Sequence, residues 1–302
     1  MENKSFRCSF VHSPAPSYAD TNFTGAQYAP LWAFTLAAYI PQGEGYSTSL
    51  YDTRFTPCES IPEAELFLFS GLDQDYETLL DTRLELAKKY PSAVFAIGGP
   101  ICNSFDQGGK IDELSAFDHI FTGDGEEVIK DLLEAVRYDD RLDHLVRVQK
   151  RFTFSTAKPP SESLLKKDIE KYYGGMIEVS RGCPFLCEFC DVRTYPDNNR
   201  PHNKDPKTIV KEVERYAQFG VSRILLVCDN FIGDLRWAER VADELIEFQK
   251  SSPFKVSFFT ESTTNLYKYP ELMRKLRAAG FDMLHIGVES FSNSALLETA
   301  KV

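Results

Sequence analysis

Segments with the pattern of β-strands alternate with segments that have the pattern of helices along most of this chain. In the first half, short runs with alternating or continuous apolar residues predict strands, and longer runs with apolar residues at helical spacing predict helices. The strand-like runs are "SFRCSFVH", "STSLYDT", "ELFLFS", "SAVFAIGGP" and the start of "FDHIFTGDGEEVIKDLLEAV"; the helix-like runs are "APLWAFTLAAYI", "DYETLLDTRLELAKKY" and the stretch from Glu126 onward. This alternation predicts an α/β fold with a parallel, Rossmann-like sheet, and ligands beyond the carboxyl ends of its strands.

The second half repeats the alternation with clearer helix boundaries. The helix in "DPKTIVKEVERYAQFG" has Asp205 as its expected N-cap, Pro206 in the first turn and Gly220 beyond its end. The predicted strands are Met176–Ser180, "RILLVCDN", "FKVSFFTES" and "FDMLHIGVES"; the other predicted helices are "DLRWAERVADELIEFQK" and "YPELMRKLRAAG". Four such strands predict part of a (β/α) barrel or an open sheet, with the site on the loops after the strands.

A segment rich in Pro, Ser and charge, "TAKPPSESLLKKDIEKYYGG", separates the two series. A chain of 302 residues has room for about two domains. The sequence therefore predicts a first domain over residues 1–155, a linker over 156–172 and a second domain over 173–302.

Composition excludes some classes of protein. The net charge of −11 argues against a general binder of nucleic acid, since neutralising phosphates needs surplus cations. The chain contains neither an apolar run long enough to cross a membrane nor a signal-peptide pattern at "MENKSFRCSF". Seven cysteines, an odd number, fit a reducing compartment, so we expect a cytoplasmic protein.

Three cysteines lie within eight positions directly after the first strand of the second series. They are Cys183, Cys187 and Cys190, in "RGCPFLCEFCDV". Structural zinc needs four ligands, so a zinc site would require a distant partner such as His202 or Cys228. A disulfide leaves one of the three unpaired. An iron–sulfur cluster is the third interpretation: three thiolates would leave one iron of a [4Fe–4S] cluster with an open coordination position.

The spacing Cys-x-x-x-Cys-x-x-Cys is the signature of the radical S-adenosylmethionine (SAM) superfamily, which this segment resembles. Phe189 occupies the position that is typically aromatic in that family, and Arg181, Gly182 and Pro184 are similar to the loop of many cobalamin-type members. The resemblance implies a [4Fe–4S] cluster held by the three cysteines and SAM bound at the open iron. It further implies cleavage of SAM to a 5′-deoxyadenosyl radical that abstracts hydrogen from a substrate.

Further residues after the other strands resemble segments that contact SAM in this family. The resemblance assigns cofactor binding to Asp229 and Asn230 in "VCDNFIGD", to Glu261 and Ser262 in "TEST", and to Glu289 in "IGVES" as a ligand of the ribose. The alternative for Asp229 and Glu261 is a solvated rim. Glu289 is predicted to lie inside an apolar strand, where an unpaired carboxylate is costly. Two more residues are expected to be structural, Cys228 as a small buried residue and His285 as an interior or barrel-lining histidine.

The first half, over residues 5–137, resembles the cobalamin-binding-type domain that precedes the catalytic domain in one class of radical SAM enzymes. The resemblance rests on a strand followed by "GGP" and a strand followed by "TGDGEE"; the same glycines could serve turn geometry alone. The early loop "HSPAPSYADTNFTG" lacks the Asp-x-His-x-x-Gly that supplies an axial cobalt ligand. Some members bind cobalamin without that His, so the resemblance leaves open whether cobalamin is a third cofactor beside the cluster and SAM. We expect its binding to be weak.

Members of the family usually have six strand–helix units, whereas four strands are predicted here, so we expect a partial barrel in a chain truncated at its C-terminus. The leading hypothesis is a radical SAM methyltransferase or cyclase that acts on a small-molecule or lipid-like substrate and receives electrons from a donor such as flavodoxin or ferredoxin. The alternatives are an iron–sulfur protein for electron transfer or redox sensing, and an inactive truncated relative. The sequence assigns no catalytic residue that acts on the substrate.

Overall fold

The computed structural model describes residues 5–16, 28–41, 43, 45–195 and 197–301. Its contacts divide the chain into two compact units. The first unit holds residues 1–152 and 160–168, and the second holds 153–159 and 169–302. The expected linker over 156–172 therefore contributes to both units, and it contains a helix, α6 (Glu162–Asp168), which belongs to the first.

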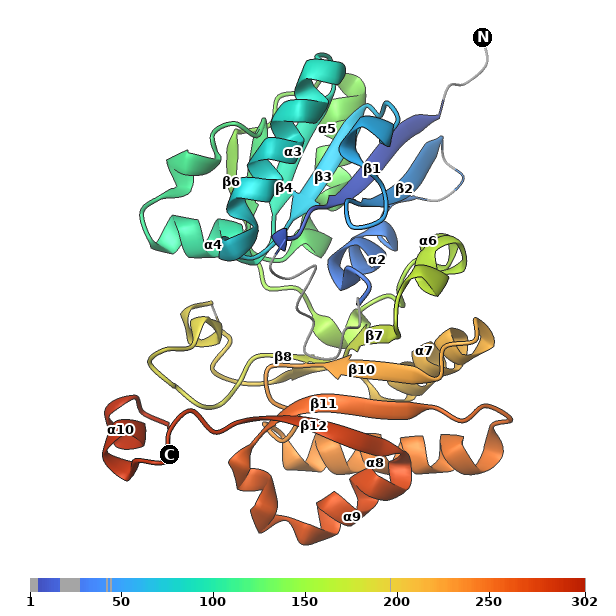
Figure 1. Ribbon diagram of the computed structural model, residues 1–302, viewed down its shortest axis with the longest axis vertical. Coiled ribbons are helices and arrows are strands. Elements are labelled where there is room, and N and C mark those ends of the chain that lie inside the picture. Colours follow the sequence, from blue (N-terminus) through green and yellow to red (C-terminus); the bar gives the residue numbers. More distant parts are fainter. Residues whose placement is uncertain (1–4, 17–27, 42, 44, 196, 302) are drawn as a thin grey trace. The chain divides into compact units, whose positions relative to one another are not determined.

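The first unit is built on a six-stranded sheet in the order β2-β1-β3-β4-β5-β6, with every neighbouring pair parallel (Figure 1). The strand order reverses direction at β1 and β3, and such a switch point is where ligands enter open α/β sheets. The strands are β1 (Phe6–His12), β2 (Tyr46–Asp52), β3 (Leu66–Ser70), β4 (Val94–Gly98), β5 (His119–Thr122) and β6 (Leu145–Arg147).

Apolar side chains on both faces of this sheet explain why it needs helices as cover. All five residues of β3 are buried, as expected of a central parallel strand. A core cluster joins Phe67, Phe95 and Ile97 of the sheet to Leu79 and Leu86 of α3. The helices of this unit, besides α6, are α2 (Leu31–Ala37), α3 (Tyr76–Lys89), α4 (Pro100–Gln107) and α5 (Ile129–Tyr138).

The second unit carries a four-stranded parallel sheet in the order β7-β10-β11-β12, which is also the order of these strands along the chain. The strands are β7 (Gly175–Glu178), β10 (Arg223–Val227), β11 (Ser257–Thr263) and β12 (Phe281–Gly287). A separate antiparallel pair, β8 (Ser180–Arg181) with β9 (His202–Asn203), follows β7.

Helices cover one face of this second sheet. They are α7 (Pro206–Gln218), α8 (Leu235–Ser251) and α9 (Pro270–Ala279), and Figure 1 shows α8 and α9 together on one side of the strands. Along β10, Ile224 and Leu226 are buried, whereas Leu225 and Val227, which alternate with them, are only half-buried, so the helices cover every second residue. A short last helix, α10 (Asn293–Glu298), follows β12.

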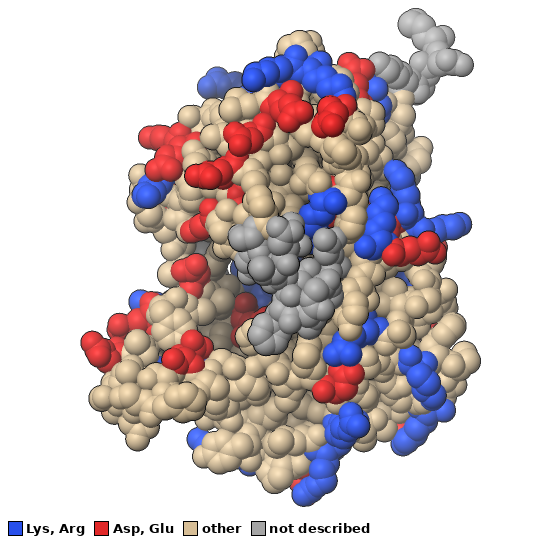
Figure 2. All heavy atoms as spheres, viewed as in Figure 1, with Lys and Arg blue, Asp and Glu red and all other residues tan. Residues whose placement is uncertain are grey.

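The α/β fold with two parallel sheets confirms the predicted fold class. Several short elements were not predicted, among them α6, β9, the three-residue strand β6 and the helix α4, which begins directly after Gly99. No helix among the described residues is long and apolar enough to span a membrane. On the face shown in Figure 2, acidic and basic side chains are interspersed.

Candidate functional site

The cysteine loop is the segment between β8 and β9. Pairing of Ser180 with Asn203 and of Arg181 with His202 brings the two ends of the loop together. The backbone N–H of Cys183 donates to the carbonyl of Asn198 at 2.9 Å, which ties the start of the loop to its return. All three cysteines thus lie on one closed loop, which follows the carboxyl end of β7, the first strand of the second sheet.

The three thiols of this loop are free and partly buried. Burial raises the pKa of the Cys183 thiol, although hydrogen bonds from the Phe185 backbone and the Asn230 amide oppose the shift. Burial likewise raises the pKa of Cys190. Within the described residues, no three His, Cys, Asp or Glu side chains are gathered tightly enough to hold one metal ion. A [4Fe–4S] cluster spreads its cysteines over different irons, so three free thiols on one loop are a donor set that fits such a cluster.

The alternative fourth ligands of a zinc site lie elsewhere. A ring nitrogen of His202 is 2.7 Å from the backbone oxygen of Asp197. Cys228 is 3% exposed, its sulfur lies 3.4 Å from the Thr260 hydroxyl, and burial raises its pKa to about 12. Cys228 is therefore the small buried residue that its sequence context predicted.

The end of β10 anchors the cysteine loop. The Asp229 carboxylate accepts a hydrogen bond of 2.5 Å from the backbone N–H of Gly182. Asn230 is 2% exposed, and its side-chain amide lies 3.9 Å from the sulfur of Cys183. The side-chain oxygen of Asn230 accepts a hydrogen bond from the backbone N–H of Ile232. The structure thus brings both residues predicted on this strand to the cysteine loop.

The end of β11 supplies polar groups beside the same site. Glu261 lies on the open face of the sheet, and partial desolvation raises its pKa; His285 opposes this shift, and the charge of Asp229 adds to it. Ser262 is 6% exposed, and the hydroxyls of Ser262 and Thr263 are buried without a hydrogen-bond partner. Buried hydroxyls without a partner are uncommon, and at the mouth of a parallel sheet they point to a ligand.

One residue near β12 does not lie where we predicted it. The strand ends at Gly287, so Glu289 follows it instead of lying within it. Its backbone is left-handed, with φ 61°, and its carboxylate pairs with Lys301 at 2.7 Å. The physical reason is that the segment after Gly287 turns away from the strand direction. His285 is exposed and lies opposite Glu261 on the open face of the sheet, where the barrel-lining alternative would place it.

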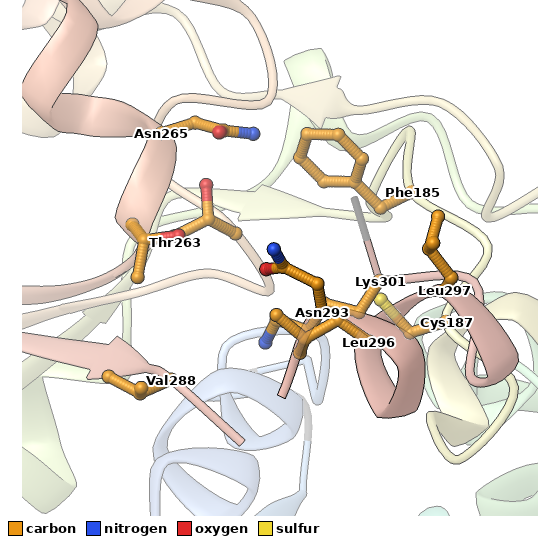
Figure 3. A pocket seen from close by; sticks show the side chains of 10 residues that line it. Phe185, Cys187, Thr263, Asn265, Val288, Asn293, Leu296, Leu297 and Lys301 are labelled. Carbon is orange, nitrogen blue, oxygen red and sulfur yellow. The ribbon is translucent and has the colours of Figure 1, made fainter. Parts of the chain in front are cut away.

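A cavity of about 390 Å³ opens between the cysteine loop and the ends of β11 and β12. Figure 3 shows its side chains around one space, with Thr263 and Asn265 on one side and Phe185, Cys187 and Leu297 on the other. Phe189 does not line it; this ring is 52% exposed and lies next to Lys301.

Sequence reasoning missed the part of the cavity wall that is formed by the end of β11 with the two residues after it, by α10 and by Lys301. These residues are Thr263, Thr264, Asn265, Asn293, Leu296, Leu297 and Lys301. The run of small polar residues in "TESTTN", directly after a buried strand, is a signal that could have pointed to the first three.

Comparison with known proteins agrees with this geometry. Residues 177–301 match the family model of the radical SAM superfamily. The hopanoid C-2 methylase of Rhodopseudomonas palustris is 27% identical over 289 residues, which cover 93% of this chain and 52% of that protein. The anaerobic magnesium-protoporphyrin IX monomethyl ester cyclase of Synechocystis is 22% identical, over 85% of this chain and 56% of that protein.

The fold is also similar to a solved structure. The radical SAM methyltransferase TsrM of Kitasatospora setae, determined with cobalamin and a [4Fe–4S] cluster bound, superposes with a TM-score of 0.75 at 15% identity. The match covers 97% of this chain and 60% of TsrM. The chain spans about half the length of the two sequence relatives. The family match covers the residues that form the cysteine loop and most of the second parallel sheet, so this part of the chain is similar to the radical SAM superfamily.

Proposed function

We propose that this protein is a radical SAM enzyme that binds a [4Fe–4S] cluster through Cys183, Cys187 and Cys190. Its reaction would be methyl transfer or ring formation. The observation that carries this proposal is a set of three free thiols on one closed loop, at the carboxyl end of a parallel strand and beside a cavity. When bound, the cluster would supply the electron that cleaves SAM into methionine and a 5′-deoxyadenosyl radical.

The residues of the chain have distinct parts in this proposal. The hydrogen bond from Gly182 to Asp229 holds the cysteine loop against the neighbouring strand. The Asn230 amide, next to the sulfur of Cys183, stabilises the thiolate form that a metal ligand needs. Both groups come from rigid strand ends, which keep the three thiols in place when the loop receives the cluster.

We assign the cavity beside Cys187 to SAM. Thr263 lines it and offers a hydroxyl without a partner among the described residues. Glu289, next to the lining residue Val288, offers a carboxylate that could accept hydrogen bonds from ribose hydroxyls. The predicted contact of Ser262 with SAM stays part of the proposal. The apolar wall formed by Phe185, Leu296 and Leu297 would exclude water from the reacting groups. Phe189 and Glu261 lie around the same loop ends, and their predicted contacts with SAM stay part of the proposal.

The substrate and the partners follow from weaker observations. The methylase and the cyclase that this chain resembles act, by their names, on a hopanoid and on a magnesium porphyrin ester, which are large and mainly apolar molecules. We therefore propose a small-molecule, lipid-like substrate, with an external donor such as flavodoxin or ferredoxin supplying electrons. All seven cysteines are free, which supports a place in the reducing cytoplasm. Residues 1–155 are proposed as the cobalamin-type domain and 173–302 as the catalytic one.

The test is anaerobic reconstitution of the full chain, followed by iron and sulfide analysis and an assay for 5′-deoxyadenosine with dithionite as reductant. We expect about four irons and four sulfides per chain and formation of 5′-deoxyadenosine. The triple Cys183→Ala, Cys187→Ala, Cys190→Ala variant should lose both. Cys58→Ala, which removes a half-buried cysteine of the first unit, is the matched control and should keep both.

Three other outcomes would contradict the proposal, each in its own way. Unchanged iron and sulfide in the triple variant would show that other ligands hold the cluster. About one zinc per chain after purification without oxygen would favour the structural zinc site. A complete cluster without 5′-deoxyadenosine would favour an electron-transfer or sensing protein, or an inactive relative.

A further inference from the structure

The segment that follows β12, residues 288–301, packs back onto the cysteine loop. The backbone N–H of Glu188, between the second and third cysteines, donates to the carbonyl of Thr299 at 3.0 Å. β7 and β12 are the two edges of the four-stranded sheet, so this contact joins segments that follow opposite edges. The segment and the loop therefore form facing walls of the 390 Å³ cavity.

Lys301 lies at the centre of this junction. Its ammonium is 2.7 Å from a carboxylate oxygen of Glu289 and 5.6 Å from the ring centroid of Phe189 on the cysteine loop. Its side chain also lines the cavity together with Cys187. The Lys301 side chain is 17% exposed and the Glu289 side chain is 39% exposed, so water reaches this pair from the carboxylate.

The backbone around Glu289 needs such support. A non-glycine residue at φ 61° is in a sparsely populated conformation that persists only where surrounding contacts hold it. A Cβ on Gly287 would lie 2.6 Å from the Glu289 carboxylate and 2.9 Å from the Lys301 ammonium. Glycine at this position leaves room for the pair to lie over the end of β12. The carboxylate thus has a defined place, and its ion pair with Lys301 uses one of its two oxygens.

We propose that Lys301, which lines the SAM cavity, is a positioning residue: it fixes the Glu289 carboxylate next to Val288 of one wall and holds the cysteine loop at Phe189. This inference rests on the proposed function, because it assumes that SAM uses the cavity. Lys301 acts through Glu289 and Phe189 and needs no contact of its own with SAM.

The test is a double-mutant cycle on the reconstituted full chain, with SAM affinity as the readout. Lys301→Met should raise the SAM dissociation constant about three- to tenfold, and Glu289→Gln about tenfold or more. The double variant should equal Glu289→Gln within about twofold, since Lys301 has little to position once the carboxylate is gone. Lys301→Arg keeps the charge and should restore affinity to within about twofold of the parent.

The matched control is Lys275→Met, which removes a lysine of the same unit that pairs with Asp243 at 2.9 Å on the helical side of the sheet. It should leave SAM affinity unchanged. Additive effects of Lys301→Met and Glu289→Gln, or no effect of Lys301→Met, would overturn the inference.

Hydrogen exchange separates this inference from the proposed function. In Lys301→Met, and not in Lys275→Met, the peptides that cover residues 183–192 and 288–301 should exchange faster, whether or not SAM binds. Unchanged exchange would overturn the positioning role. If the parent binds no SAM while exchange responds as expected, the proposed function fails and the junction stands.

Discussion

Gly182 shows how one residue sets the path of the cysteine loop. Its backbone has φ 95°, and a Cβ there would overlap the carbonyl of Arg200 and lie 3.1 Å from that of Asn198. Both carbonyls belong to the return of the loop, so the two sides approach more closely than a side chain allows. Gly220 has a similar φ of 81°, but a Cβ there would meet nothing within 4 Å.

The two glycines separate backbone strain from steric overlap. Gly220→Ala should lower the free energy of unfolding by about 1–3 kcal/mol, through the left-handed backbone alone. Gly182→Ala should cost about 1–3 kcal/mol more, because the added methyl group has no room. Urea unfolding followed by Trp237 fluorescence in a Trp32→Phe background reports on the second unit, since these are the two tryptophans of the chain. Equal losses in the two variants would show that the loop can open at Gly182.

At the scale of elements, a buried ion pair joins the end of the cysteine loop to its supporting helix. Lys204, directly after β9, contacts Glu212 of α7 at 3.0 Å, and their side chains are 4% and 1% exposed. The backbone oxygen of Lys204 also accepts from the Trp237 indole of α8 at 2.8 Å. Burial raises the pKa of Glu212 despite the attraction of Lys204, so the pair retains a desolvation cost.

Replacing one partner of this ion pair should lower the free energy of unfolding more than replacing both partners. Glu212→Leu leaves the Lys204 charge buried and unpaired, and we expect a loss of about 3–5 kcal/mol in unfolding free energy. The double variant Lys204→Met, Glu212→Leu should recover part of that loss. Asp243→Asn, which breaks the more exposed pair with Lys275, should cost less than about 1 kcal/mol. The same fluorescence measurement applies, and a double variant less stable than Glu212→Leu would contradict this account.

At the scale of the whole molecule, the chain passes between the two units more than once. Residues 153–159 belong to the second unit, 160–168 return to the first, and the chain enters the second again at Ile169. Each unit has its own parallel sheet and its own core. A cofactor of the first unit should therefore bind independently of the cysteines in the second.

Hydroxocobalamin titration of the full chain, followed by absorbance, tests the first unit. We expect weak binding, because the loop from His12 to Gly25 lacks Asp-x-His-x-x-Gly; residues 17–25 of that loop lie outside the described residues. His12 ends β1, and desolvation lowers its pKa to about 4, so the imidazole stays neutral at pH 7. The triple cysteine variant should titrate as the parent does. Tight stoichiometric binding would show that the first unit binds cobalamin without the Asp-x-His-x-x-Gly motif.

Local patterns in the sequence determined most of the elements and the position of the cysteine loop. The N-cap of α7 is an example: Asp205 accepts from the backbone of Lys207 and Thr208, contacts that depend only on neighbours in the chain. The same holds for Gly280, whose φ of 102° ends α9. Period and capping are local properties, so the sequence alone predicts them.

Only the tertiary structure decided which side chains face one another across the site. The sequence placed Glu289 inside an apolar strand, yet the strand ends at Gly287 and the carboxylate pairs with Lys301, twelve positions later. His285 is exposed opposite Glu261 because no helix among the described residues covers that face of the sheet, and the Glu188–Thr299 contact spans more than a hundred residues. These outcomes depend on which helices cover each strand and on how the segment after β12 packs against the cysteine loop. A pattern within a short stretch of sequence does not contain that information.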